Sequence, residues 1–369
     1  MQVIHAMLWF GVGLVGLVAG GEVLVHGAAR LARALGMTPL LVGLTVVAYG
    51  TSLPELAVTV HAAWTGAGEV ALGNVVGSNI VNVLLVLGLS AAITPVCVSV
   101  RLIRFDVPIM IAVSLLVFAL GWDGSISRLE GAVLLLGIVS YTVVVIWLGR
   151  REAEPEVIEE YGSAFPTPRK RPRIAWVVYG GMCCVGLGML AVGSQWMVQS
   201  AVEIAQAFQV GEWVIGLTIV AIGTSLPEMA TSLIAALRGQ RDIAVGNIVG
   251  SNLFNLLLVL GAAGVLSAEG LPVPEQARWV DMPIMVAAAA ACLPIFFTGL
   301  RIARWEGVVF VAYYLAYTAY LILRAGRYET ALYYFRETMF LFVLPLTVLG
   351  LMVTTWQSLR RNPRGNSLS

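Results

Sequence analysis

Apolar residues fill most of the chain in long runs, which are interrupted by short clusters of charged residues, prolines and glycines. The runs reach about 20 residues, the length that an α-helix needs to cross the hydrocarbon core of a bilayer. Because a helix satisfies its own backbone hydrogen bonds in lipid, the pattern predicts an all-α polytopic membrane protein. The expected membrane spans lie near residues 7–29, 38–63, 69–94, 105–122, 127–148, 174–204, 211–236, 242–266, 279–299, 303–323 and 337–357.

Parts of this pattern occur twice. GLTVVAYGTSLPELA, which begins at Gly43, returns as GLTIVAIGTSLPEMA at Gly216. GNVVGSNIVNVLLVLG, which begins at Gly73, returns as GNIVGSNLFNLLLVLG at Gly246, so both pairs are 173 residues apart (216 − 43 and 246 − 73). Weaker similarities, such as RFDVPIM with WVDMPIM, extend the duplication over all five spans of each half.

An odd number of spans per copy makes the second copy enter the membrane from the opposite face. The sequence therefore predicts two inverted five-helix repeats, or ten transmembrane helices, plus an eleventh C-terminal transmembrane helix. We expect the first repeat at 1–148, a cytoplasmic linker at 149–173, the second repeat at 174–324, and the extra helix with a basic cytoplasmic tail at 325–369. The binding site of such an architecture lies near the midplane between the halves.

Two of these segments leave alternatives open. The linker is acidic first and then basic with prolines, which predicts a solvated connection, with regulatory cation binding as the alternative. The eleventh span lies outside the repeat. It suits packing against the bundle and contact with a second copy in a homo-oligomer equally well.

The basic residues predict the orientation, because cytoplasmic loops carry an excess of Lys and Arg. With the N-terminus outside, 17 of the 22 Lys and Arg residues lie on the inner side. The other five are Arg128, Arg278, Arg324, Arg327 and Arg336. We therefore expect an integral protein of the plasma (inner) membrane, with its N-terminus outside and its C-terminus in the cytoplasm.

Composition agrees with a membrane protein and narrows the function. The chain is 59% hydrophobic and 12% charged, whereas a soluble domain has about 25% charged residues. A net charge of +1 without a basic, aromatic-rich patch excludes a nucleic-acid-binding protein. The four cysteines lack metal-ligand spacing and are interpreted as packing residues. The expected partners are small cations and the lipid bilayer.

The first repeated motif places one glutamate, Glu55 or Glu228, inside an otherwise apolar span. A carboxylate at membrane depth is costly and marks a functional site by default. Two of them, related by duplication, indicate a shared site for a cation. Thr51 shares a helix face with Glu55, four residues later, and Thr224 does so with Glu228.

A proline precedes each glutamate. Because proline has no N–H, Pro54 and Pro227 are expected to break their helices and to leave the carbonyls of Gly50 and Gly223 without a helical partner. A bound cation, a serine hydroxyl or a water molecule would each serve as the partner that a free carbonyl needs in hydrocarbon.

The second repeated motif adds neutral oxygen donors. Ser78 and Asn82 lie four residues apart on one helix face, as do Ser251 and Asn255. Further amides that would serve as donors or caps are Asn74, Asn79, Asn247 and Asn252. Oxygen donors without histidine or thiolate favour calcium, sodium or magnesium over zinc or copper.

Charge balance favours exchange over one-way transport. Calcium takes about 6–8 oxygen ligands, which two glutamates, serine and asparagine side chains and freed carbonyls would supply. Two carboxylates neutralise one divalent ion. An empty site would hold two buried negative charges and would attract sodium ions or protons in place of calcium.

These motifs resemble the sodium/calcium exchanger family, whose paired signatures match GTSLPE and GNxxGSN across the ten repeated helices. The resemblance implies calcium transport against sodium at a site between inverted repeats, with Glu55 and Glu228 as central ligands. It implies calcium coordination by the carbonyls of Thr51 and Thr224. It implies sodium ligands and a completing ring at Ala48, Ala221, Ser52, Ser225, Ser78, Ser251, Asn82 and Asn255. Some sodium-coupled members carry an aspartate in place of Asn255.

The predicted function is a secondary active antiporter that exchanges calcium for sodium, with no resident cofactor and no enzymatic activity. Exchange of calcium or another divalent cation for protons is the alternative, because the core has two carboxylates and not three. A passive channel is a more distant alternative, because it needs a continuous pore, which inverted halves and a closed site of two glutamates disfavour. An intramembrane hydrolase is also distant, since no histidine or lysine is placed as a base. Glu22, near His26 and matched by the neutral Gln195, is either a structural carboxylate or a proton relay.

Overall fold

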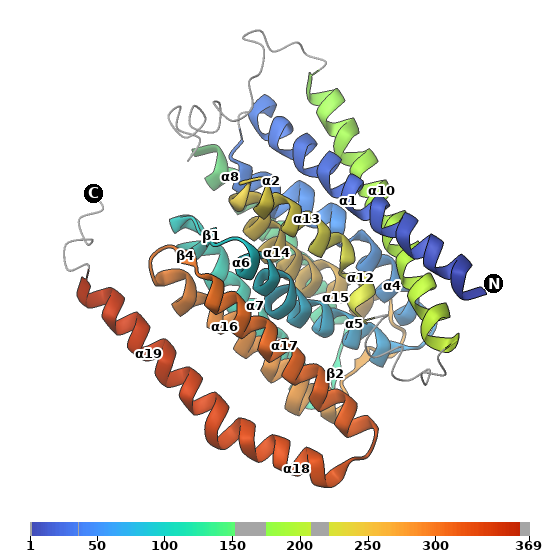
Figure 1. The fold of residues 1–369 in the computed structure, drawn as a ribbon, viewed down its shortest axis with the longest axis vertical. Coiled ribbons are helices and arrows are strands. Elements are labelled where there is room, and N and C mark those ends of the chain that lie inside the picture. The colour runs from blue at the N-terminus through green and yellow to red at the C-terminus, as the bar shows by residue number, and fades with distance from the viewer. Residues whose placement is uncertain (1, 36, 152–174, 208–220, 362–369) are drawn as a thin grey trace.

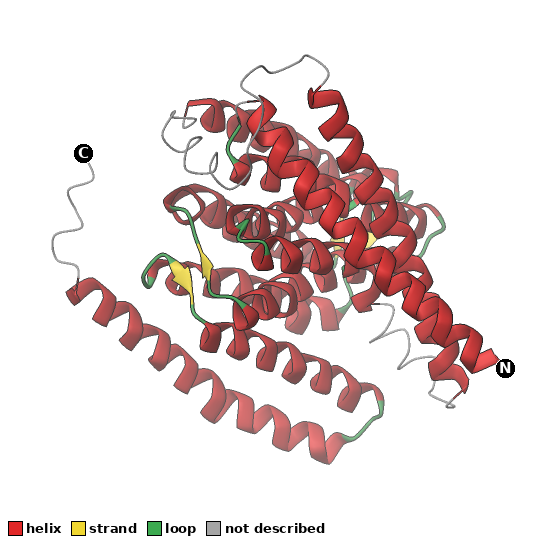
Figure 2. Cartoon of the chain, turned by 45° about the horizontal axis from the view of Figure 1, so that its top comes forward, coloured by secondary structure: helices red, strands yellow, loops and turns green. Residues whose placement is uncertain are grey.

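The computed structural model describes residues 2–35, 37–151, 175–207 and 221–361. This described part is almost entirely helical (Figures 1 and 2). Within it, nine helices are long and apolar enough to cross a membrane, and a bent pair, Pro39–Thr51 with Leu53–Trp64, would bring the number to ten. The prediction of a polytopic helical membrane protein is confirmed.

Helices of the first half match the first five expected spans. Segments labelled η are short π-helices, apart from η4, which is a 3-10 turn. The elements are α1 (Gln2–Leu35); α2 (Pro39–Val42), η1 (Gly43–Val47), α3 (Ala48–Thr51) and α4 (Leu53–Trp64); α5 (Gly68–Ile80), η2 (Val81–Leu87) and α6 (Gly88–Ile93); η3 (Leu102–Asp106), α7 (Val107–Leu120) and η4 (Gly121–Asp123); and α8 (Arg128–Arg151).

The second half repeats this order. Its elements are α10 (Ala175–Ala207); α12 (Ala221–Thr224) and α13 (Leu226–Leu237); α14 (Arg241–Phe254), η6 (Asn255–Val259) and α15 (Leu260–Leu266); η7 (Ala277–Asp281) and α16 (Met282–Phe297); and α17 (Arg304–Ala325). Most of the expected linker and the start of the expected span at 211–236 lie outside the described residues.

A final continuous helical segment forms the C-terminal edge of the molecule (Figure 1). It comprises α18 (Glu329–Thr338), η8 (Met339–Val343) and α19 (Leu344–Arg361), and it lies along the outside of α17 (Figure 1). The Tyr313 hydroxyl of α17 forms a hydrogen bond of 2.5 Å with the Thr347 hydroxyl. In the most apolar 18-residue stretch of Glu329–Gly350, no residue is buried, so this helix adds little to the core.

The repeated motifs lie on the most buried helices. In the most apolar 18-residue stretch of Gly68–Ile93, 72% of the residues are buried, and in that of Arg241–Leu266 the share is 83%. In Val3–Ala32 it is only 22%. The helices that carry GNxxGSN therefore form the centre of the bundle. Their polar residues face other protein atoms, which is where membrane proteins place costly polar groups.

Helices α1 and α10 lie side by side on the opposite flank (Figure 1). Glycines allow this close approach, because a Cβ at Gly13 would stand 2.7 Å from the carbonyl oxygen of Gly193. A Cβ at Gly186 would stand 2.7 Å from the backbone nitrogen of Leu24. Small residues at such a contact let two helix backbones pack directly in the membrane.

Two short strand pairs in the described residues join loops of the two halves. β1 (Val96–Cys97) pairs antiparallel with β4 (Arg301–Ile302), and β2 (Ser125–Ile126) pairs antiparallel with β3 (Leu271–Pro272). Each pair links a loop flanking α7 to a loop flanking its counterpart α16. The sequence analysis did not predict these strands, because two residues carry no periodic pattern.

Candidate ion-binding site

Glu55 and Glu228 are both fully buried, with an exposed fraction of 0%. Each lies in the first turn of a helix, Glu55 in α4 and Glu228 in α13. The positive end of the helix dipole favours a negative charge at that position. The two carboxylates are close enough to interact electrostatically. The structure thus brings both predicted glutamates into one buried region between the halves.

The structure interrupts both helices two residues before the prolines, at Ser52 and Ser225. Helix α3 ends at Thr51 and α4 begins at Leu53, with a bend of 45° between them. Ser52 between them leaves helical geometry, with φ −86° and ψ 6°, and Ser225 does the same in the second half, with φ −91° and ψ 8°. Pro54 and Pro227 lie in the first turn of the next helix, where the missing N–H costs nothing.

One hydrogen bond crosses between the halves directly at the carboxylates. The Ser52 hydroxyl donates to Oε1 of Glu228 at 2.9 Å. Ser225 lies in the equivalent place beside Glu55, yet its hydroxyl and both Glu55 oxygens have no hydrogen-bond partner among the described residues. The serine of each broken helix therefore lies next to the glutamate of the opposite half.

The predicted donors of the second motif lie on α5 with η2 and on α14 with η6. Ser78, Asn82, Ser251 and Asn255 are all buried, with exposed fractions of at most 2%. Asn82 lies in η2, and Asn255 is the first residue of η6. π-Helical turns of this kind are frequent at functional sites, because the extra residue changes the direction of the side chains.

These side chains share an unusual property, which is that their polar atoms are buried without partners in the described part of the chain. The unpartnered atoms are both carboxylate oxygens of Glu55, Oε2 of Glu228, the hydroxyls of Ser78, Ser225 and Ser251, and the amide atoms of Asn82 and Asn255. A buried polar atom without a partner costs roughly 1–3 kcal/mol. A cation with oxygen ligands would relieve that cost for the oxygen atoms.

The predicted backbone ligands lie at the same helix ends. Thr51 and Thr224 are the last residues of α3 and α12, where backbone carbonyls lack intrahelical partners. The carbonyl of Ala48 already accepts from the Ser52 backbone N–H at 3.1 Å and from the Thr51 hydroxyl at 3.4 Å. An ion would therefore share this carbonyl oxygen of Ala48 with two hydrogen-bond donors. Ala221 begins α12.

Asn74 and Asn247 are predicted from the sequence as further oxygen donors or caps, and in the structure their amides bond to protein hydroxyls. The Asn247 side chain accepts from Thr51 and donates to Ser232, and the Asn74 side chain accepts from Thr224 and donates to Thr59. The signal available in the sequence was the repetition of every member at the same offset of 173 (247 − 74, 224 − 51 and 232 − 59).

A second symmetric pair was missed by sequence reasoning. Asp106 ends η3 and accepts from the Tyr141 hydroxyl at 3.0 Å, and Asp281 ends η7 and accepts from the Tyr317 hydroxyl at 3.0 Å. Asp106 also lies 3.7 Å from the Arg101 guanidinium. The first pair connects the start of α7 to α8, and the second connects the start of α16 to α17. We interpret both as structural contacts between neighbouring helices.

Glu22 has a cationic partner from the other half. Its Oε1 and Oε2 accept from Nε of Arg238 at 2.9 Å and 3.1 Å, and Nδ1 of His26 lies 3.4 Å from Oε2. The ion pair connects α1 to the end of α13. These contacts support the structural interpretation of Glu22.

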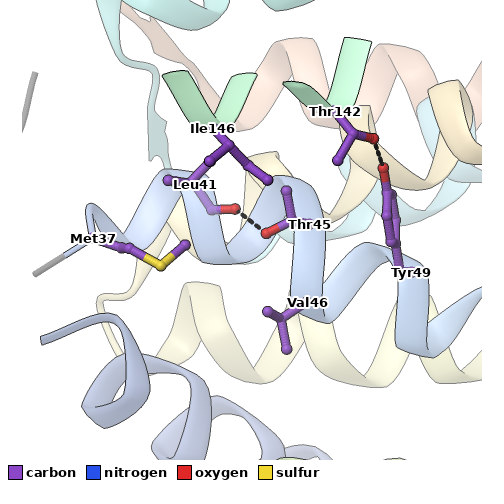
Figure 3. A pocket seen from close by; sticks show the side chains of 7 residues that line it. All are labelled: Met37, Leu41, Thr45, Val46, Tyr49, Thr142 and Ile146. Atoms are coloured by element: carbon purple, nitrogen blue, oxygen red, sulfur yellow. Dashed lines mark hydrogen bonds between the residues drawn. The ribbon is translucent and has the colours of Figure 1, made fainter. Parts of the chain in front are cut away.

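Other features of the described residues do not form a competing site. No three His, Cys, Asp or Glu side chains gather there to hold a metal ion. An apolar pocket lies between the start of the broken span and α8, with Tyr49 bonded to Thr142 on one wall (Figure 3). Its lining contains no carboxylate.

Comparisons with known proteins agree with one another. The family model described as sodium/calcium exchanger protein matches residues 5–147 and 178–323. A protein of Alkalimonas amylolytica named as a candidate antiporter, CaxA, is 40% identical over 318 residues, which covers 85% of this chain and 97% of that protein. The sodium/calcium exchanger MaX1 of Methanosarcina acetivorans is 30% identical over 340 residues, covering 84% and 96%.

A solved structure shares the fold. The sodium-calcium exchanger NCX_Mj, soaked with Na⁺ and Ca²⁺, superposes with a TM-score of 0.73 at 31% identity, covering 86% of this chain and 98% of that one. The inner membrane protein YrbG of Escherichia coli is also similar, at 35% identity over 285 residues, covering 76% of this chain and 86% of that protein.

Proposed function

Since the chain belongs to the sodium/calcium exchanger family, which is a family of membrane antiporters, we propose that it exchanges Ca²⁺ for Na⁺ by alternating access. The proposed ion site has Glu55 and Glu228 at its centre. The carbonyls of Thr51 and Thr224 would complete the calcium shell. The hydroxyls of Ser52, Ser225, Ser78 and Ser251, the side chains of Asn82 and Asn255, and the carbonyls of Ala48 and Ala221 would serve the flanking ions.

The observation that carries this proposal is the set of unpartnered oxygen atoms around two buried carboxylates. A cation that accepts the lone pairs of these oxygen atoms would compensate for their burial in an apolar helical bundle. One Ca²⁺ balances the two carboxylates, and the same oxygens suit Na⁺. A site that is stable when filled but carries uncompensated charge when empty favours strict exchange over one-way release.

The proposed architecture is two inverted five-helix repeats with an extra C-terminal helix. The strand pairs support it, because exchanging the two halves converts the pair β1·β4 into the pair β3·β2. The glycine contacts support it as well, since Gly13 and Gly20 of α1 meet Gly193 and Gly186 of α10, their own counterparts in reverse order. A two-fold axis in the membrane plane produces this reciprocity.

We place the N-terminus outside and the C-terminus in the cytoplasm of the inner membrane. The excess of basic residues on one side supports this orientation. The Escherichia coli relative is named an inner membrane protein, which supports a location in that membrane.

Proton coupling is the second candidate function, and one observation favours it. The two sequence-related positions at the start of the π-helical turns are both amides, Asn82 and Asn255, so the site holds two carboxylates. Two protons would balance the two carboxylates when calcium leaves. Sodium remains the leading coupling ion, because the family model and the relative MaX1 are named for sodium/calcium exchange.

The glutamates provide the direct test of the site. We expect Glu55→Gln and Glu228→Gln each to reduce calcium uptake into proteoliposomes at least about a hundredfold, because each removes half of the charge that balances the ion. Glu69→Gln is the matched control, since Glu69 also lies in the first turn of a helix but is exposed. Near-normal uptake in either site variant would refute the assignment.

A further inference from the structure

Two asparagines connect the halves of the molecule beside the proposed site. Asn247 of α14 and Asn74 of α5 occupy the same position in the two copies of GNxxGSN. Asn247 is fully buried. Its hydroxyl partner within the second half, Ser232, is also fully buried, as is Thr59, the partner of Asn74 within the first half. Neither asparagine was needed to build the ion shell, so their hydrogen bonds require a separate account.

Each asparagine side chain makes one bond within its own half and one to the opposite half. Asn247 donates from Nδ2 to the Ser232 hydroxyl at 2.9 Å, and its Oδ1 accepts from the Thr51 hydroxyl at 3.2 Å. Asn74 donates from Nδ2 to the Thr59 hydroxyl at 2.9 Å, and its Oδ1 accepts from the Thr224 hydroxyl at 3.5 Å. The two sets are reciprocal.

The direction of the amide is fixed in the second half. Nδ2 of Asn247 also lies 3.4 Å from the backbone carbonyl of Glu228. A carbonyl only accepts, so the nitrogen must face Glu228 and the oxygen must face Thr51. The Thr51 hydroxyl has a second acceptor in its own helix, the carbonyl of Ala48 at 3.4 Å, but Oδ1 of Asn247 is closer.

The threonines need an external constraint, because each is the last residue before a helix break. Thr51 ends α3, and Ser52 after it has left helical geometry. Nothing within its own helix holds the Thr51 carbonyl in place. A bond from its side chain to α14 ties that helix end to the half that contains Glu228.

We propose that Asn74 and Asn247 are positioning residues, which assemble the ion site by holding each threonine against the opposite half. This inference rests on the proposed function, because it concerns the placement of the Thr51 and Thr224 carbonyls as calcium ligands. The asparagines do not touch the ion. They keep the two half-sites at the separation that calcium requires.

The test removes the cross-half bond from each side. Thr51→Val removes the hydroxyl but retains the volume and the backbone carbonyl, and Thr51→Ser restores the hydroxyl. We expect Thr51→Val to raise the KM for calcium uptake about tenfold, the effect of losing one buried hydrogen bond. Asn247→Ala also loses the contacts to Ser232 and to the Glu228 carbonyl, so it should raise the KM at least as much. Thr51→Ser should stay within about twofold of the wild type.

The chain offers matched controls. Thr45 lies in the same broken span, but its hydroxyl donates to the Leu41 carbonyl of its own helix at 2.6 Å (Figure 3). Asn79 lies in the same motif as Asn74, but its amide donates to the Val75 carbonyl of its own helix at 2.8 Å. Thr45→Val and Asn79→Ala should leave the KM unchanged.

A double-mutant cycle separates positioning from general stabilisation. If Thr51 and Asn247 act through one bond, the double variant should raise the KM no more than Asn247→Ala alone. Thr51→Val combined with Asn74→Ala breaks both cross-half bonds, and the effects should multiply. A KM that stays at the wild-type value while only the amount of folded protein falls would overturn the proposal, as would multiplication in the Thr51–Asn247 pair.

The same cycle distinguishes this proposal from the proposed function. Wild-type protein without calcium uptake would refute the exchange activity but not the contact. In that case the cycle is measured on thermal unfolding midpoints in detergent. Additive shifts for Thr51→Val and Asn247→Ala would then overturn the cross-half bond, and non-additive shifts would support it.

Discussion

Single residues in this protein divide into those that the sequence identifies and those that only the fold reveals. Glu55 and Glu228 stand out in the sequence, because a carboxylate inside an apolar span has few roles other than function. Ser78 and Asn82, with their copies, are identified by their spacing on a helix face. The bond from Thr51 to Asn247 joins residues 196 positions apart, so it depends on how two distant helices pack.

Asn255 is the residue that most directly concerns the coupling ion. Replacing it by aspartate adds a third carboxylate to the site. We expect Asn255→Asp to lower the sodium concentration for half-maximal exchange by about tenfold, because one charge a few ångströms from an ion is worth more than 1.4 kcal/mol even at an effective dielectric constant of about 20. The KM for calcium should change less, because the side chain of Asn255 is proposed to serve a flanking ion and not the central calcium.

Sodium activation curves of calcium exchange in proteoliposomes measure this effect. Asn255→Ser is the control, since it keeps an oxygen donor without adding a charge. If the sodium curve of Asn255→Asp overlays that of the wild type, our interpretation of this position is wrong.

At the scale of elements, the helix breaks were predictable and the π-helical turns were not. Pro54 and Pro227 predict the breaks, because proline lacks the backbone N–H that a continuous helix needs. The π-helices at Asn82, Asp106, Asn255 and Asp281 have no local signature. At two of them the structure adds a tertiary contact, from Tyr141 to Asp106 and from Tyr317 to Asp281, which depends on how distant helices pack.

The contact between α1 and α10 makes a prediction about stability. In Gly186→Ala the new Cβ would stand 2.7 Å from the Leu24 nitrogen and 2.9 Å from the Gly20 carbonyl oxygen. Backbone atoms cannot move aside as a side chain would, so we expect a loss of about 1–3 kcal/mol. In the same helix, a Cβ at Gly188 meets nothing within 4 Å.

Gly188→Ala is therefore the control, and it should be neutral or stabilise the helix by up to about 1 kcal/mol. Thermal unfolding in detergent compares the two variants. Equal midpoints for Gly186→Ala and Gly188→Ala would contradict the close packing of α1 on α10.

At the scale of the whole molecule, the duplication produces contacts that run from each half to the other. The strand pairs β1·β4 and β2·β3 connect the loops, and the glycines of α1 pack against those of α10 in reverse order. Serine, threonine and asparagine bonds between the halves surround the glutamates. The polytopic helical architecture was predictable from hydropathy. The pairing of the halves was not, because sequence periodicity contains no information about distant contacts.

A site shared by two halves is suited to alternating access, because a relative movement of the halves changes which face of the membrane the ions reach. The proposed charge balance adds the coupling. In the proposed mechanism, the two buried carboxylates stay compensated while the halves move, so sodium ions would replace calcium before the site returns to the other face.

Calcium uptake into proteoliposomes under two separate gradients tests this account most directly. One preparation has an outward sodium gradient at equal pH, and the other has a pH gradient without sodium. The account predicts uptake driven by sodium alone, which Glu55→Gln should abolish. Uptake that requires the pH gradient and ignores sodium would contradict it and would make the protein a calcium/proton exchanger.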